Sequence, residues 1–429
     1  MGLPLRKLLI SVLAGAALLL AAFPAFAQEQ HKQEPPAFSS GYRLPVQTFP
    51  APRAPIFAWV DVSVLVAALA LAAYFSVTRR SRTGIRALSV CCLAYFGFYR
   101  QGCICPVGSV QNVALAMTHS GYALPVTVGL FFLLPLLTAL FFGRVFCAAV
   151  CPLGALQDLL LLRPVRVAPA VEQTLSLLPY AYLGAGLLFA STGASFVICK
   201  YDPFVGVFRL AAPVSMIALG GVFLALSTVV GRPYCRFLCP YGVLLRWASM
   251  LARWKPEVAP VRCVNCHLCA STCPFGALRP SVAAMEIEPL PIRRRRAARI
   301  LATGPAIVAA LAALGWLGAP MLATVHPVVA HADLIWTKHQ AGRAGVAGTV
   351  VALAPDPSEM PVLHEAALIR RKFFVASALF GGWLGLVVWL RLLALSRRDD
   401  APFYVADPAA CLACARCYGL CPGEVKTAE

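Results

Sequence analysis

The chain has 429 residues, of which 60% are hydrophobic and 13% are charged, and its mean hydropathy is +0.75. Soluble domains contain about 25% charged residues, so this composition excludes a soluble enzyme and predicts a protein that lies largely in a membrane. The 37 basic residues outnumber the 18 acidic ones and give a net charge of +19. In a membrane protein such an excess marks the cytoplasmic loops, and we expect no nucleic-acid partner.

Residues 1–27 have the features of a secretory signal peptide. Arg6 and Lys7 precede an apolar stretch, and an A-x-A cleavage site ends at Ala27. Residues 28–56 are polar and rich in proline, which is typical of a linker. We therefore expect residues 28–56 to lie in the periplasm, before the first membrane span.

Seven apolar stretches follow, and most reach the ~20 residues that a helix needs to cross ~30 Å of hydrocarbon. They lie near residues 57–77, 85–101, 122–142, 178–198, 212–230, 300–322 and 373–392. A periplasmic start leaves most arginine clusters in the cytoplasm, although Arg370, Arg371 and Lys372 fall in the periplasmic loop 323–372. The sequence thus predicts an all-α, multi-pass protein of the bacterial inner membrane, surrounded by lipid.

Two cysteine runs have the C-x2-C-x2-C-x3-C-P spacing of bacterial ferredoxins, one in residues 256–290 and one in residues 396–429. Zinc sites usually use separated C-x-x-C pairs, and disulfides do not suit the cytoplasm, so two [4Fe-4S] clusters explain the runs best. In two-cluster ferredoxins the fourth cysteine of each run binds the other cluster. The predicted ligand sets are Cys263, Cys266, Cys269 and Cys421 for one cluster, and Cys411, Cys414, Cys417 and Cys273 for the other.

The ferredoxin is interrupted by membrane segments. Between its halves the chain is expected to leave through a helix at 291–322, form the loop 323–372 and return through a helix at 373–395. Both halves must meet in the cytoplasm if they are to share two clusters.

A repeat lies in the predicted five-helix membrane core, residues 57–255. Gly143-Arg144-Val-Phe-Cys-x3-Cys-Pro matches Gly231-Arg232-Pro-Tyr-Cys-x3-Cys-Pro, 88 residues later. Each copy ends an inward-running span, so two parallel hairpins related by an axis along the membrane normal are expected. The thiols of both copies would then form a third iron–sulfur site near the cytoplasmic boundary, and free thiols at a close helix contact are the alternative. These thiols belong to Cys147, Cys151, Cys235 and Cys239.

A weaker repeat marks the expected outer ends of the second and fourth spans. It supplies Cys103, Cys105 and Cys199 as cofactor-binding candidates. Because that side is oxidising, a Cys103–Cys199 disulfide is an equal alternative. The small residues at 191–195 resemble the motif on which FMN is attached to exported flavoproteins, with Thr192 as the attachment point. Phe189 stands where an acidic residue is expected, so a helix end rich in small residues is the preferred interpretation.

Taken together, the paired G-R-x-[FY]-C-x3-C-P motifs, the stretches at 102–112 and 199–206 and the two ferredoxin runs resemble the membrane polyferredoxin family of NosR, NapH and CcoG. The similarity covers residues 57–280 and 400–425 and is greatest to the membrane half of NosR. It implies electron transfer between a cytoplasmic or quinone donor and a periplasmic flavoprotein, cytochrome or copper protein. NosR carries an exported flavin domain where this chain has residues 28–56, so a flavin would come from a separate protein.

The predicted function is therefore that of an electron-transfer subunit. A hydrocarbon core of ~30 Å is long for one electron hop, so an intermediate carrier between the two sides is expected. One alternative is a CcoG-like reductase that converts cupric to cuprous ion for an exported copper enzyme, because soft thiolates suit Cu(I). Another is a redox-sensing regulator, which would need a signalling partner.

Overall fold

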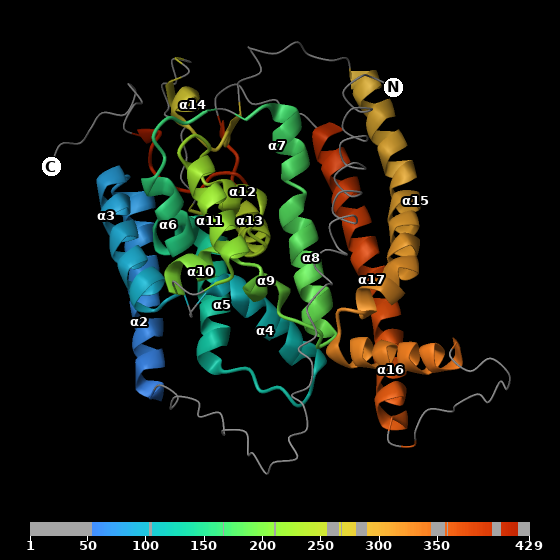
Figure 1. Ribbon diagram of the computed structural model, residues 1–429. Coiled ribbons are helices and arrows are strands. Elements are labelled where there is room, and N and C mark those ends of the chain that lie inside the picture. Colours follow the sequence, from blue (N-terminus) through green and yellow to red (C-terminus); the bar gives the residue numbers. More distant parts are fainter. Residues whose placement is uncertain are drawn as a thin grey trace. The chain divides into compact units, whose positions relative to one another are not determined.

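The structure is a computed structural model in which most of the chain is helical (Figure 1). The described residues are 54–102, 105–165, 167–209, 212–254, 266, 268–279, 290–344, 357, 359–396 and 405–418. The predicted signal peptide and nearly all of the linker lie outside them. The chain divides into two compact units, with the boundary between Ser63 and Val64. The described residues of the first unit, 54–63, contain the start of helix α2, and all other elements of the described residues lie in the second unit.

Four helical segments are long and apolar enough to cross a membrane. They are Pro55–Thr78 (α2, Pro55–Ala73, and the π-helix η1, Tyr74–Thr78), Ala170–Ser191 (α7, Pro169–Leu175, and α8, Leu178–Ser191), Pro291–Ala323 (in α15, Leu290–Ala323) and Met360–Ser396 (α17). They coincide with four of the seven predicted spans. Shorter apolar helices, α5 (Val126–Phe142) and α11 (Val214–Ser227), coincide with two more. The remaining stretch forms α3 (Arg82–Cys92) and the π-helix η2 (Leu93–Tyr99). A total of seven spans stays a prediction.

Short helices connect these segments and carry the cysteine motifs of the core. They are α4 (Pro106–Thr118), η3 (Phe146–Val150), α6 (Pro152–Leu159), α9 (Val197–Lys200), α10 (Pro203–Arg209), α12 (Pro233–Phe237) and α13 (Tyr241–Met250). Proline lies in the first turn of α4, α6 and α12, where its missing N–H costs no helical hydrogen bond. Cys151 is extended before Pro152, as residues before proline usually are, so η3 ends there and α6 starts in a new direction.

Helices α15 and α17 form a close antiparallel pair. A Cβ on Gly315 would lie 2.1 Å from the Ser377 carbonyl oxygen, and one on Gly381 would lie 2.0 Å from that of Leu311. Such approaches of two backbones are typical of small residues at helix interfaces in membranes. This pair links the two ferredoxin halves. At its far end, α16 (Pro327–Ala344) crosses α17 (Figure 1), and the Arg370–Asp333 ion pair connects the two helices.

The prediction of an all-α fold holds for the described residues apart from one small sheet. Strands β1 (Leu278–Arg279) and β2 (Val405–Ala406) pair in antiparallel register, with Leu278 opposite Ala406. Two-residue strands are too short to give a periodic signal in the sequence, so hydrophobic patterning could not predict them. The remaining described helix, α14 (Leu268–Thr272), lies just before β1.

Candidate iron–sulfur sites

The small sheet joins the two halves of the predicted ferredoxin. Beside the β1–β2 pair, the Asp407 N–H donates to the Ala277 carbonyl oxygen at 2.7 Å. The loop that ends the first cysteine run therefore lies against the loop that holds the second run. Residues far apart in the sequence thus form one site.

Four thiols border one cavity between these loops: Cys273, Cys411, Cys414 and Cys417. Its other walls are mostly apolar and include Phe275 and Tyr418. This is the set that the ferredoxin spacing predicts for one cluster. The structure brings the four residues together, and a cubane that shares them is consistent with their chemistry.

The loop of the second run is tightly folded around its sulfur atoms. Ala413 and Ala415 have left-handed backbones, with φ of 54° and 57°, and the Ala413 N–H points to Cys411 Sγ at 3.5 Å. Backbone donors of this kind favour a thiolate over a thiol. Burial acts in the opposite sense and raises the pKa of Cys411 to about 12, and it also raises the pKa of Cys414. Cluster binding must therefore displace protons from these cysteines.

The other predicted ligand set cannot be followed as completely. Cys266 is exposed and Cys269 is partly buried on α14. Cys263 and Cys421 lie outside the described residues. The set Cys263, Cys266, Cys269 and Cys421 stays a prediction.

The second ferredoxin half is fastened to the membrane core by side chains that donate to its backbone. Ser76 Oγ donates to the Ala413 carbonyl oxygen at 2.8 Å, and Arg82 Nη1 donates to that of Cys414 at 3.2 Å. Arg144 Nη1 reaches the Ala409 carbonyl oxygen at 3.2 Å. These donors come from η1, α3 and the first repeat motif, so three separate segments of the core hold the loop.

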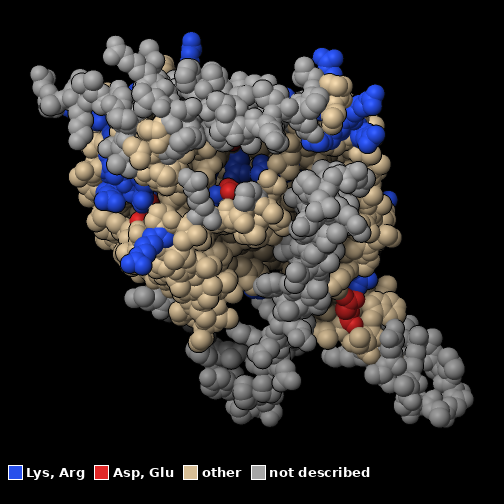
Figure 2. Space-filling model, turned by 90° about the horizontal axis from the view of Figure 1, so that it is seen from above, with Lys and Arg blue, Asp and Glu red and all other residues tan. Residues whose placement is uncertain are grey.

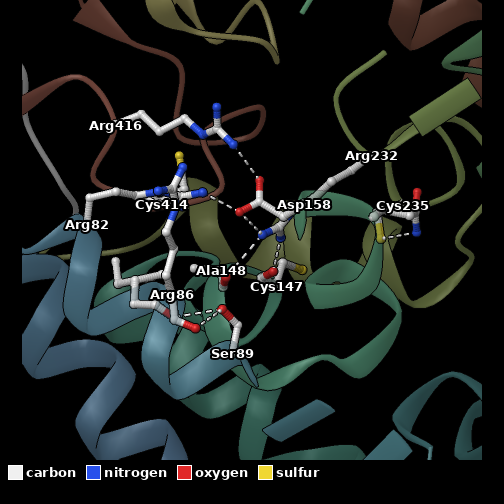
Figure 3. Close-up of polar contacts among 12 residues, drawn as sticks. Arg82, Arg86, Ser89, Cys147, Ala148, Asp158, Arg232, Cys235, Cys414 and Arg416 are labelled. Carbon is white, nitrogen blue, oxygen red and sulfur yellow. Dashed lines mark hydrogen bonds and ion pairs between the residues drawn. The ribbon is translucent and has the colours of Figure 1, made fainter. Parts of the chain in front are cut away.

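Asp158, on α6, is the acidic centre of this contact (Figure 3). Its side chain is 6% exposed and forms ion pairs with Arg82, with Arg416 at 3.0 Å and with Arg232 at 3.6 Å. Burial alone would raise the pKa of Asp158, but the guanidinium groups of Arg232, Arg82 and Arg416 hold it well below its usual range. Asp158 thus stays ionised and joins both repeats to the second ferredoxin half.

Arg232 extends this network to the cysteines of the CxxxCP repeat, here called the membrane cysteines (Figure 3). They are Cys147, Cys151, Cys235 and Cys239. The side chain of Arg232 is fully buried; Nη1 donates to the Cys147 carbonyl oxygen, and Nη2 donates to that of Ala148 at 3.1 Å. One guanidinium therefore contacts the Cys147 turn and also Asp158, which holds the Cys414 loop through Arg82. The positive charge of Arg232 thus lies between the Cys147 turn and the loop of the second ferredoxin run, which contains Cys414.

The four cysteines of the repeat lie near one another. Cys147, Cys151 and Cys235 are buried and Cys239 is partly exposed. The other three lie close enough to Cys151 to interact with it electrostatically. Two polar side chains point to their sulfur atoms: Gln157 Nε2 lies 3.5 Å from Cys235 Sγ, and Arg144 Nη2 lies 3.8 Å from Cys147 Sγ. Donors to sulfur are among the features that set the potential of an iron–sulfur cluster.

The contacts of the two copies are reciprocal. A Cβ on Gly154 would lie 3.1 Å from Arg232 Nη1, and a Cβ on the equivalent Gly242 would lie 3.5 Å from Arg144 Nη2. The arginine of each copy therefore packs against the glycine of the other copy. Because glycine has no side chain, the guanidinium group fits there. The two motifs face each other in the way that the sequence repeat predicts.

The weaker cysteine repeat lies closer to the CxxxCP cysteines than expected. Cys105 and Cys151 line the same small cavity, together with Asp202, so Cys105 and the CxxxCP cysteines are not at opposite ends of the core. The chain turns through left-handed Gln101 and Gly102 as soon as η2 ends, which directs Cys105 back toward the core. Hydropathy marks an apolar stretch but not the depth at which its helix stops.

Cys199 lies beside the loop of Cys105. Its N–H donates to Gln111 Oε1 at 3.2 Å, and its sulfur would be 2.9 Å from a Cβ on Gly108. Cys103 lies outside the described residues, so the Cys103–Cys199 disulfide stays a prediction. The described residues contain no group of three or more His, Cys, Asp or Glu side chains that could hold a single metal ion.

Thr192, the residue considered for flavin attachment, is 5% exposed. Its hydroxyl donates to the Leu188 carbonyl oxygen at 2.9 Å in its own helix. A covalently attached flavin needs an accessible hydroxyl, and this one faces the helix backbone. The geometry favours the alternative of a helix end that is rich in small residues.

The sequence interpretation missed two residues of this network, Gln157 and Asp158. Both lie on α6, the helix that begins at Pro152, the last residue of the first repeat motif. An acidic residue between apolar stretches, in a chain with 18 acidic residues among 429, was a usable signal. Its arginine partners, in contrast, come from three distant segments and could not be assigned from sequence.

Two family models, each described as a 4Fe-4S binding domain, match the chain. One covers residues 124–167 and 212–258, which contain both CxxxCP motifs, and the other covers residues 256–279, which contain the first ferredoxin run. The membrane cysteines thus belong to a pattern that is itself associated with iron–sulfur clusters. No solved structure matches the chain.

Curated proteins with similar sequences include NirI of Paracoccus denitrificans, which is 33% identical over 164 residues, 33% of this chain and 23% of NirI. The regulatory protein NosR of Pseudomonas aeruginosa is 30% identical over 218 residues, 47% of this chain and 30% of NosR. YccM of Escherichia coli, described as an electron transport protein, is 27% identical over 154 residues, 32% of this chain and 43% of YccM. The chain spans less than a third of the length of NirI and NosR. It is related to the NosR- and NirI-type membrane iron–sulfur proteins.

Proposed function

We propose that this protein conducts electrons within the bacterial inner membrane, from ferredoxin-type clusters in the cytoplasm to a redox protein in the periplasm. That it is an iron–sulfur electron-transport protein follows from its relatives and from the two 4Fe-4S binding domains. The direction of flow, the orientation in the membrane and the periplasmic partner, expected at loop 323–372, are part of the proposal. A quinone is the candidate donor if the electrons do not come from the cytoplasm.

The observation that carries this proposal is a series of contacts that connects the loop of the second ferredoxin run with the repeat cysteines of the core. The Cys414 loop contacts Arg82, and Arg82 shares Asp158 with Arg232, which contacts the Cys147 turn. Cys105 then shares a cavity with Cys151. Cysteines of three motifs are thus connected by contacts or a shared cavity, which supports an intermediate carrier between the two sides.

Clusters bound to these cysteines would supply one-electron chemistry, and the described residues act on their charge and position. Arg232 and Arg144 hold positive charge beside the Cys147 turn, which favours electron-rich thiolates and a reduced cluster. Gln157 connects the two copies, because it donates to Cys235 Sγ and its Oε1 accepts the Tyr234 N–H at 3.1 Å. Cys147, Cys151 and Cys235 are buried, which keeps water away from their sulfur atoms.

The iron content per chain tests the third site. Anaerobically purified protein is expected to contain about twelve irons and as many acid-labile sulfides, whereas two cubanes alone would give about eight. Cys147→Ser and Cys235→Ser are each expected to lower the number by about four and to remove one signal from EPR spectra taken at stepped potentials.

The matched control is Cys91→Ser, because Cys91 is exposed on α3 and lies outside every motif. It should leave the iron content unchanged. About eight irons in the wild type, with no loss in Cys147→Ser, would limit the clusters to the ferredoxin halves. Copper that copurifies and is lost in Cys105→Ser would instead favour the cupric reductase.

A further inference from the structure

The second repeat motif packs directly against the loop that follows Cys273. A Cβ on Gly231 would lie 3.0 Å from the Phe275 ring and 3.2 Å from the Pro274 carbonyl oxygen. The Arg232 guanidinium lies 5.9 Å from the centre of the same ring. Pro274 and Phe275 are both buried in this contact. The first ferredoxin half therefore contacts the second repeat, whereas the second half is fastened to the first repeat.

One arginine makes the polar part of this contact. Arg236, on α12, directly follows Cys235 in the second motif. Its Nη1 donates to the Pro274 carbonyl oxygen at 3.3 Å, and its Nη2 forms an ion pair with Glu172 of α7. The Arg236 side chain is only 10% exposed, whereas that of Glu172 is 34% exposed. A mostly buried positive charge thus contacts the residue that follows Cys273.

The backbone of the loop leaves room for this ion pair. Gly276 has a φ of 62°, and a Cβ there would lie 3.3 Å from Arg236 Nη2 and 3.6 Å from Glu172 Oε2. A larger residue would be strained by the left-handed backbone and would compete with the ion pair for space. The loop after Cys273 therefore lies close to both charges of the pair.

Charges near an iron–sulfur cluster help to set its reduction potential. Reduction adds an electron, so a nearby positive charge raises the potential and a nearby negative charge lowers it. Cys273 borders one cavity with Cys411, Cys414 and Cys417, and the ion pair lies against its loop. On this end of the molecule Lys and Arg are prominent and Asp and Glu are few (Figure 2). Glu172 is thus one of few negative charges that can offset Arg236 there.

We propose that Arg236 is a positioning residue that holds the Cys273 loop on the second repeat and raises the reduction potential of the cluster bound there. Glu172 offsets part of this effect. The inference rests on the proposed function, because it requires a cluster at the cavity that Cys273 borders. Arg236 also adjoins Cys235, so the charge that acts on this cluster lies where the ferredoxin meets the membrane cysteines.

A redox titration of the anaerobically purified full chain, followed by EPR, tests this proposal. Arg236→Gln removes the positive charge but keeps an amide donor, so one ferredoxin-type signal should appear at a more negative midpoint potential. Arg236→Lys keeps the charge and should restore most of the wild-type value. Glu172→Gln leaves Arg236 without its counterion and should move the same signal to a more positive potential. That shift should be the smaller one, because the more exposed Glu172 is screened more strongly.

The control is Arg370→Gln, which breaks an arginine–carboxylate pair between α16 and α17 and should leave every midpoint potential unchanged. A purely structural role would move the signal in the same direction in Arg236→Gln and Glu172→Gln, and this result would overturn the proposal. Unchanged potentials in both variants, with the iron content retained, would do the same. If Arg236→Gln does not retain its iron, the positive shift in Glu172→Gln must still be seen. A wild type without any ferredoxin-type signal would contradict the proposed function itself, and this inference with it.

Discussion

Asp158→Asn is expected to destabilise the protein by about 3–5 kcal/mol, because it removes the acidic partner of a buried ion-pair cluster. Arg232 is fully buried, and Arg82 and Arg416 are 18% and 16% exposed, so water cannot replace the lost carboxylate. The variant should also release the second ferredoxin half from the core. The free energy of unfolding in mixed detergent micelles and the iron content per chain measure the two effects.

Asp333→Asn is the matched control for this substitution. Asp333 also pairs with an arginine, Arg370, but the two side chains are 42% and 39% exposed. An exposed pair contributes about 0–1 kcal/mol, so this variant should be close to the wild type. Equal losses in the two variants would show that the burial of Asp158 has no special effect.

The pH dependence of Asp158 has a definite sign. Its pKa is lower in the folded protein than in the unfolded chain, where an aspartate has a pKa of about 3.9. The stability that Asp158 contributes is therefore fully present above that value and is lost only as the pH falls toward the folded pKa. The difference between the wild type and Asp158→Asn should stay constant from neutral pH to about pH 5 and shrink below about pH 4.

Cysteine spacing predicted which cysteines lie together at one cavity, whereas hydropathy did not predict the position of Cys105. The spacing identifies Cys273 as the fourth cysteine of the first run, and in two-cluster ferredoxins this residue binds the cluster of the other run. The structure places Cys273 at the same cavity as the cysteines of the second run. The turn at Gln101 and Gly102 brings Cys105 near Cys151, and no periodic pattern marks such a turn. Hydropathy reports that a segment is apolar, whereas tertiary packing decides how far it extends.

The repeat shows why internal similarity is informative without any comparison protein. Equivalent residues of two copies that face each other must make equivalent contacts, and Arg232 on Gly154 mirrors Arg144 on Gly242. The symmetry ends beyond the motif, because Asp158 in one copy corresponds to Arg246 in the other. One copy thus supplies the acid that fastens the ferredoxin half, and the other has a residue of opposite charge at the equivalent position.

Gly381→Leu is expected to destabilise the α15–α17 pair by more than about 3 kcal/mol. Its Cβ would lie 2.0 Å from the Leu311 carbonyl oxygen, and its other neighbours on α15 are also backbone atoms, which cannot move aside as a flexible side chain could. Overpacking usually costs about 1–3 kcal/mol, and a clash between two backbones should exceed that range. The free energy of unfolding in mixed micelles gives the magnitude.

The same substitution tests whether the helix pair positions the ferredoxin. Helix α17 leads directly into the second half, so Gly381→Leu should lower the iron content although no cysteine is changed. Gly318→Leu is the control on the same pair, because a Cβ there meets no atom within 4 Å. It should change stability by about 0.5 kcal/mol or less. If Gly381→Leu keeps its full iron content while its stability falls, the ferredoxin is held by the Asp158 cluster and its neighbouring backbone contacts alone.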